Sequence, residues 1–223
     1  MIRVLVIVEG TSEEFFVTKV LAPALWPWNV MLTARILGVP GHKGGRTNYA
    51  RARSDVLLCL KQDKRSYCST MLDLYGLGDG FPGKPLTANL PSTQKAIHIE
   101  QAMSANICKI IPDLRSEVRF IPYIQVHEYE ALLFSDPPAL AASLNKSHLA
   151  LQFQKVRDSF ATPEDIDDGP ETAPSKRILG IHPSYSKVLE GTIAAQSIGV
   201  RTMRRECPHF NDWLDHLCSL LPL

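Results

Sequence analysis

The stretch Arg3–Val8 (RVLVIV), with Glu9-Gly10-Thr11-Ser12-Glu13 directly after it, decides the fold. A continuous run of mostly β-branched residues predicts a strand that is buried on both faces, as in a parallel sheet. Gly10 predicts a tight turn, and Thr11 or Ser12, followed by acids, predicts the start of a helix. The chain therefore opens with a strand, a turn and a helix.

Strands and helices alternate in the same way as far as residue 135. Three further strands are predicted from apolar runs: Val30–Leu37, Cys68–Leu74 and Glu117–Val126. Helices are predicted between them: one that ends at Pro23 and Pro27, one that runs through Leu60, and one that begins at Ser92 as its N-cap and ends near Ile111. This alternation predicts an α/β fold with a mainly parallel, Rossmann-like sheet flanked by helices. We expect residues 1–136 to form this core and 137–223 a helical C-terminal extension, both within one compact unit.

Composition narrows the class of protein. The chain has 223 residues, 45% of them hydrophobic, and a formal net charge of +1, which argues against disorder and against nucleic-acid binding by bulk charge. Its five cysteines are widely spaced without a CxxC pair, so a disulfide framework or a zinc ribbon is not expected. Without a signal peptide or a membrane-length apolar run, a soluble cytoplasmic protein is expected.

Acidic residues follow three of the four predicted strands. Glu9 follows the first, Asp73 lies at the end of the third, and Glu128 and Glu130 follow the fourth, while Glu13 lies one helical turn beyond Glu9. Parallel strands gather ligands at their carboxyl ends, and hard divalent cations prefer carboxylate oxygens. The acids therefore predict a Mg²⁺ or Mn²⁺ site, although acids after a strand also commonly cap the next helix.

Basic residues gather in two segments that could bind phosphate. The first, after the second strand, holds Lys43, Arg46, Arg51 and Arg53 among glycines that allow a close backbone approach. The second begins with Lys176, the last residue of the polar loop 162–176, and continues with Arg177 and Lys187. Lys176 is the first candidate for stabilising charge on a phosphoryl group and Lys187 the second. Solvated loops and local surface ion pairs remain the alternatives.

Other residues that could carry chemistry are better explained by structure. His127 could be a base or a metal ligand, but a histidine at a strand end more often makes a structural hydrogen bond. Cys207 and His209 resemble a nucleophile and its base, yet no partner acid is evident. Trp26 and Trp28 are typical of core or interface aromatics.

Several of these motifs together resemble a known family. The opening VEG with EGTSEE resembles the first motif of Toprim domains and the spaced glutamates of OLD-type nucleases, and TMLDLYGL resembles the later Toprim strand, with Asp73 as its first aspartate. With FIPYIQVHEYEALLFSDP, the GPETAPSKR loop and CPHFNDWL, nearly the whole chain is similar to a family of largely uncharacterised Toprim-like bacterial proteins. These are often encoded beside an ABC/SMC-like ATPase in phage-defence loci.

The resemblance implies a metal-dependent nuclease that acts in anti-phage defence. Glu9, Glu13, Asp73, Glu128 and Glu130 would hold Mg²⁺ or Mn²⁺, Glu9 could alternatively act as a general acid or base, and Lys176 would support the phosphoryl charge. Nucleic acid, DNA rather than RNA, and the ATPase subunit are the implied partners, and a homo-oligomer is left open.

The second aspartate of the Toprim DxD motif is absent, because Tyr75 stands in its place. The alternative is therefore a weak or inactive Toprim-like module that binds and regulates the ATPase.

Overall fold

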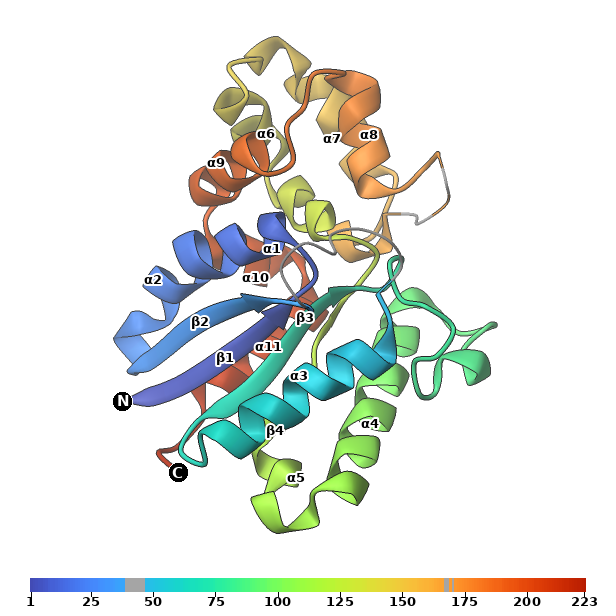
Figure 1. Ribbon diagram of the computed structural model, residues 1–223. Coiled ribbons are helices and arrows are strands. Elements are labelled where there is room, and N and C mark those ends of the chain that lie inside the picture. Colours follow the sequence, from blue (N-terminus) through green and yellow to red (C-terminus); the bar gives the residue numbers. More distant parts are fainter. Residues whose placement is uncertain (39–46, 167–168, 170) are drawn as a thin grey trace.

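The computed structural model describes residues 1–38, 47–166, 169 and 171–223, and its centre is a parallel sheet (Figure 1). The strands are β1 (Ile2–Val8), β2 (Val30–Ile36), β3 (Tyr67–Asp73), β4 (Phe120–Ile121) and β5 (Ile124–Gln125). Their order is β2-β1-β3-β4, β5 also pairs with β3, and every described pairing is parallel. Helices flank the sheet, so the predicted α/β fold is confirmed.

Helices cover both faces of this sheet. On one face, α3 (Tyr49–Gln62) and α4 (Ser92–Ile110) pack on the side chains of Leu5 and Ile7. On the other, the alternate residues Val4 and Val6 share a core with the helices of residues 11–25 and with α11 (Pro208–Cys218). The burial of β1 on both sides follows from this arrangement, as its apolar run predicts.

The first helical region is longer than predicted. It runs without a break through α1 (Thr11–Phe16), the π-helical turn η1 (Val17–Leu21), α2 (Ala22–Leu25) and the 3₁₀ turn η2 (Trp26–Trp28). The prediction that Pro23 ends the helix is wrong, because the π turn shifts the hydrogen-bond register just before the proline and so accommodates its missing N–H. Gly10, rather than Thr11 or Ser12, is the N-cap residue.

The predicted strand Glu117–Val126 is divided. Its first residues form the short helix α5 (Ser116–Arg119), and Pro122, which has no N–H to donate to a sheet, separates β4 from β5. The Thr70 side chain of β3 bridges the interruption, because its Oγ1 donates to the Tyr123 carbonyl (3.0 Å) and accepts the Tyr123 N–H (2.9 Å). The Thr70 side chain therefore supplies hydrogen bonds where the backbone pairing between the strands is interrupted.

The C-terminal helices lie above the carboxyl ends of the strands and behind the sheet (Figure 1). They are α6 (Pro137–Ser143), α7 (Ala150–Asp158), α8 (Pro174–Ile181), α9 (Leu189–Ile198), α10 (Val200–Glu206) and α11. The buried 3₁₀ segment η5 (Tyr129–Ser135) connects them to the sheet. Phe16 packs against Tyr129 and Phe210, at ring distances of 4.9 and 6.1 Å, so both parts share one core. In the described part of the chain, no helix has the length and apolar character that crossing a membrane requires.

Candidate functional site

Two of the predicted acids meet where β1 and β3 end. Glu9 follows β1, Asp73 is the last residue of β3, and the two strands are neighbours. The Glu9 Oε2 atom accepts a hydrogen bond from the Asp73 N–H at 3.3 Å, and the Thr47 side chain also hydrogen-bonds to Glu9. The parallel pairing of β1 with β3 thus brings together carboxylates 64 residues apart in the chain.

Two glycines leave room for the side chains of Glu13 and Glu9. Glu13 is buried in the first turn of α1, and a Cβ atom on Gly10 would lie 3.2 Å from its Oε2. A Cβ atom on Gly76, in the turn after β3, would lie 2.6 Å from Glu9 Oε1. The Glu9 carboxylate therefore lies directly against the Gly76 backbone.

The segment after β5 brings two further carboxylates. His127 adopts a left-handed conformation, with φ of 60°, which turns the chain from β5 into η5. The Tyr129 N–H then donates to Asp73 Oδ1 at 3.1 Å, and Glu128 Oε2 accepts the N–H of Ser175 at 3.0 Å. These two bonds tie the strand ends to η5 and to α8.

One lysine lies among these acids. The Lys187 Nζ atom is 3.0 Å from Glu130 Oε1, and the Glu130 side chain is only 1% exposed. The Tyr185 hydroxyl is also buried, and it has no hydrogen-bond partner among the described residues. Of the two lysines predicted to face a phosphoryl group, the structure pairs Lys187 with a buried carboxylate.

Burial and mutual repulsion raise the pKa values of the carboxyl groups. For Glu9 and Asp73, burial is the main cause and the charge of Glu13 adds to it. Burial likewise raises the pKa of Glu13, and it raises the pKa of Glu130 to about 7 although the Lys187 ammonium acts to lower it. Burial alone would lower the pKa of Lys187, but the charges of Glu130 and Glu128 raise it above its ordinary value. Among the described residues, the Lys187 ammonium is thus shared by several carboxyl groups that repel one another when ionised.

The donor chemistry of the candidate ligands fits a hard divalent cation, because Glu9, Glu13, Asp73, Glu128 and Glu130 all offer carboxylate oxygens. Across the described residues, no set of three or more His, Cys, Asp or Glu side chains is arranged so that it could hold a metal ion. Three of the carboxylates instead accept backbone N–H groups, from Asp73, Tyr129 and Ser175. Metal binding would require these side chains to turn toward a common ion.

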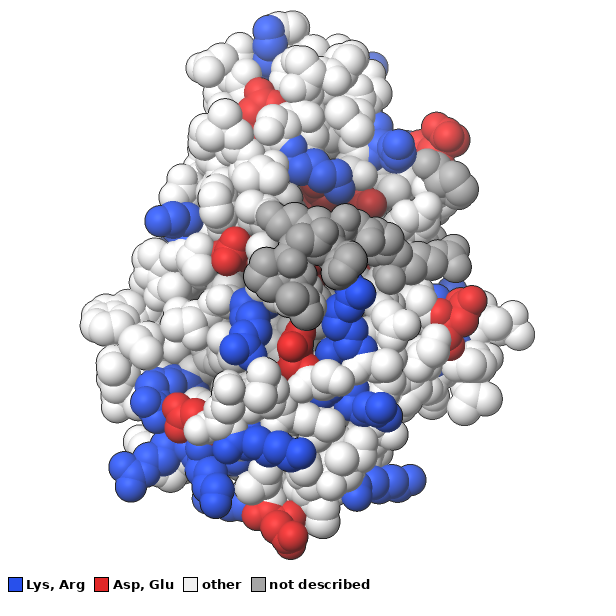
Figure 2. Space-filling model, in the orientation of Figure 1, with Lys and Arg blue, Asp and Glu red and all other residues white. Residues whose placement is uncertain are grey.

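The other basic residues that the sequence suggested for phosphate binding lie in different environments. Lys176 is exposed in α8 directly after Ser175, whereas Arg177 stacks over Phe160 and donates to the Thr172 carbonyl, which gives it a structural contact. Arg51 is exposed and Arg53 half-buried on α3. Figure 2 shows Lys and Arg side chains gathered on the lower half of this face of the molecule. Lys43 and Arg46 lie outside the described residues.

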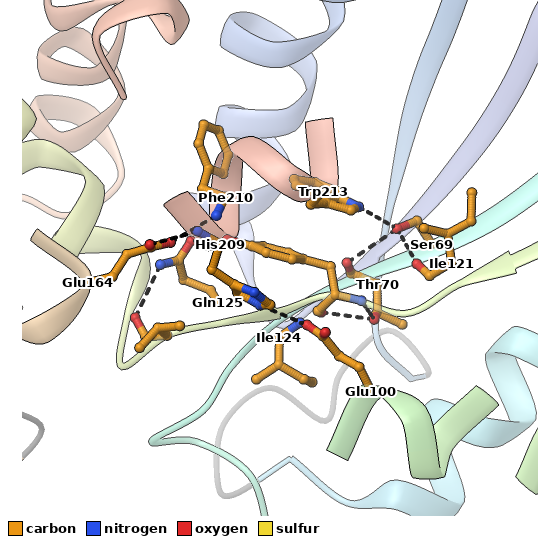
Figure 3. A network of polar contacts seen from close by, with 12 residues as sticks. Ser69, Thr70, Glu100, Ile121, Ile124, Gln125, Glu164, His209, Phe210 and Trp213 are labelled. Atoms are coloured by element: carbon orange, nitrogen blue, oxygen red, sulfur yellow. Dashed lines mark hydrogen bonds and ion pairs between the residues drawn. The ribbon is translucent and has the colours of Figure 1, made fainter. Parts of the chain in front are cut away.

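Residues near Cys207 are structural. Burial raises the pKa of the Cys207 thiol, and its sulfur lies 3.4 Å from Ser135 Oγ. His209 is bound to Glu100 at 3.0 Å and stacks on Tyr123 in the network of Figure 3. Cys207 and His209 accordingly both lie within the packed interior.

Several contacts of the site could not be expected from sequence. The bond of Thr47 to Glu9 and the bond of Ser175 to Glu128 carry no sequence signal, because both join segments that only folding brings together. The close contact of Gly76 with Glu9 does have a signal in the glycine of the LYGL motif.

A family model described as a domain of unknown function, DUF4276, matches residues 8–218. The chain belongs to this family. The match spans all the carboxylates described above and the C-terminal helices. No curated protein and no solved structure matches the chain.

Proposed function

We propose that this DUF4276 protein is a metal-dependent nuclease that cleaves phosphodiester bonds of nucleic acid, as an effector of anti-phage defence. One observation carries the proposal: carboxylates from β1, α1, β3 and η5 lie close enough at one edge of the sheet to raise each other's pKa values. Burying like charges destabilises a fold, so a cluster of buried carboxyl groups with raised pKa values is a candidate functional site. The similarity of the motifs around Glu9 and Asp73 to Toprim domains and OLD-type nucleases supports the same function.

The residues that would hold Mg²⁺ or Mn²⁺ are Glu9, Glu13, Asp73, Glu128 and Glu130. When bound, such an ion activates water and stabilises the leaving oxygen of a phosphodiester. Residues of the chain supply the remaining tasks. Burial and the charge of Glu13 raise the pKa of Glu9, which favours its protonated form and suits it to a role in proton transfer. Lys187, and Lys176 on the exposed start of α8, would orient and neutralise the phosphate.

The proposal is tested with purified protein, Mg²⁺ or Mn²⁺, and plasmid, linear duplex and RNA substrates. We expect cleavage that EDTA abolishes and that the double variant Glu9→Gln/Asp73→Asn lowers by at least about a hundredfold, because it removes the charge of two central carboxylates but keeps their shape.

The matched control is Glu14→Gln/Asp79→Asn. It removes the same charge from less buried positions nearby, since Glu14 follows Glu13 and the Asp79 side chain is 88% exposed. Equal cleavage by the wild type and the Glu9/Asp73 variant would refute the proposal.

A second candidate function has its own observation. Trp26 and Trp28, on η2, are 61% and 50% exposed, and tryptophan is enriched in protein interfaces rather than on open surfaces. This favours an interaction module, and the family resemblance implies an ABC/SMC-like ATPase as its partner, with the carboxylates catalytically weak. Calorimetry with Mn²⁺ separates the two candidates, because a protein that binds no metal favours the module.

A further inference from the structure

Six cations contribute to one surface of the molecule, which we call the basic face: Arg51, Lys61, Lys64 and Arg65 are exposed, and Arg3 and Arg35 are half-buried. Side chains alternate along a strand, and the neighbours Val4 of β1 and Leu32 of β2 point into the core that contains α11. Arg3 and Arg35 therefore point to the opposite side of the sheet, where α3 packs. The exposed Thr33 shows that α3 leaves β2 uncovered there.

The other four cations lie along α3 and the turn after it. Arg51, in the first turn of α3, lies against the end of β2, since a Cβ atom on Gly38 would be 2.9 Å from the Arg51 side chain. Lys61 is in the last turn, and Lys64 and Arg65 are exposed in the turn that leads to β3. Arg53 is two residues from Arg51 and so lies on another side of the helix.

The two carboxylates within the basic face are already engaged. Asp55 accepts the Gly38 N–H at 3.0 Å, and Asp63 pairs with Arg3 at 2.9 Å and accepts the Arg65 N–H at 2.9 Å. The face therefore keeps a positive excess although the whole chain carries only +1. Figure 2 shows the Lys and Arg side chains gathered on the lower half of this view, around α3 and the adjoining sheet edge of Figure 1.

The basic face begins at the candidate site. Thr47, whose side chain bonds to Glu9, lies two residues before the start of α3. From there, the 14 residues of α3 lead to Lys61 and the turn at the opposite edge of the sheet. At 1.5 Å per residue α3 is about 21 Å long, which corresponds to about six base pairs at 3.4 Å each.

We infer that the basic face binds the phosphate backbone of duplex nucleic acid and leads it to the carboxylates. The inference rests on the proposed function for the identity of the polyanion. Proteins that bind single strands stack bases on exposed aromatic side chains. Among the described residues of β1, β2, α3 and the turn after it, the only large hydrophobic side chain that is clearly exposed on this face is Leu58. A surface with cations and no aromatic platform fits backbone contacts that do not depend on sequence.

The test measures binding of a fluorescent duplex of arbitrary sequence by anisotropy, in EDTA and over a series of salt concentrations. The variant Lys61→Glu/Lys64→Glu/Arg65→Glu is compared with Lys19→Glu/Lys155→Glu/Arg201→Glu, which changes three exposed cations on other elements by the same total charge. We expect the first variant to bind at least about tenfold more weakly, with a salt slope reduced by about two to three, and the control to bind nearly as the wild type does.

Equal binding by the two variants would overturn the inference, as would a wild type that binds single strands or anionic vesicles more tightly than duplex. Equal melting temperatures show that both variants are folded. Failure of the proposed function has a different signature. If the duplex binds through the basic face but no metal supports cleavage, the inference holds and the nuclease proposal falls. If Glu9→Gln/Asp73→Asn binds duplex normally and does not cleave it, both hold.

Discussion

Gly76 shows how one residue can shape the candidate site. Its backbone lies so close to the Glu9 carboxylate that a Cβ atom would be 2.6 Å from Oε1 and 2.9 Å from Oε2. Its φ is not in the left-handed region, so alanine can adopt the same backbone conformation. The contact with Glu9, rather than the geometry of the turn, is what requires glycine here.

Gly76→Ala should therefore disturb the site more than the fold. Glu9 must turn away from the new methyl group, and a misplacement of about 1 Å can cost a site about a hundredfold in activity. We expect Mn²⁺ affinity, measured by calorimetry, to fall at least about tenfold, with a loss of unfolding free energy below about 1 kcal/mol. Gly80→Ala is the control, because a Cβ atom there meets nothing within 4 Å. Unchanged Mn²⁺ binding in both variants would show that Glu9 does not need its present position.

At the scale of elements, α11 depends on a distant segment for its cap. Pro208 opens the helix without a side-chain cap of its own. Glu164, from the short helix Pro163–Asp165, accepts the N–H groups of His209 and Phe210 with its two oxygens, each at 2.9 Å (Figure 3). Part of the polar loop 162–176 thus anchors α11, and α11 in turn reaches the sheet where Trp213 Nε1 donates to Ser69 Oγ at 3.0 Å.

Removing this cap should destabilise the protein. Glu164→Ala leaves two buried helix N–H groups without an acceptor, so we expect the unfolding free energy to fall by about 1–3 kcal/mol in urea titrations. Glu164→Gln should lie in between, because its amide has one accepting oxygen. The control is Glu171→Ala, an exposed acid of the same loop. Equal losses for Glu164→Ala and Glu171→Ala would contradict the capping role.

For the molecule as a whole, the carboxylates make stability depend on pH and on metal. The raised pKa values of Glu9, Glu13, Asp73 and Glu130 mean that the folded state holds more protons than the unfolded chain. The contribution of each group to the unfolding free energy is therefore lost as pH rises through its folded-state pKa, which for Glu130 lies at about 7. Each unit of upward shift corresponds to about 1.4 kcal/mol.

We accordingly expect the metal-free protein to melt at a lower temperature near pH 8 than near pH 5. Mn²⁺ should raise the melting temperature more near pH 8, where ionised carboxylates can bind it. His209, whose pKa is raised by Glu100 despite its burial, changes stability in the same direction. The comparison with Glu9→Gln/Asp73→Asn isolates the carboxylates, because this variant should show a flatter pH dependence and little response to Mn²⁺. An equal response in both proteins would place the metal elsewhere.

The amino-acid sequence is enough to predict the α/β class, the strands β1, β2 and β3, and the placement of Glu9 and Asp73 at strand ends. These features follow from local patterns, since apolar runs predict buried strands and parallel strands end at one edge. Four features are visible only in the folded chain: the Thr70 bridge beside Pro122, the pairing of Lys187 with Glu130, the Glu164 cap of α11, and the position of Arg3 and Arg35 beside α3. Each of these contacts joins segments far apart in the chain, and their approach depends on how the helices pack on the sheet rather than on any neighbouring residue.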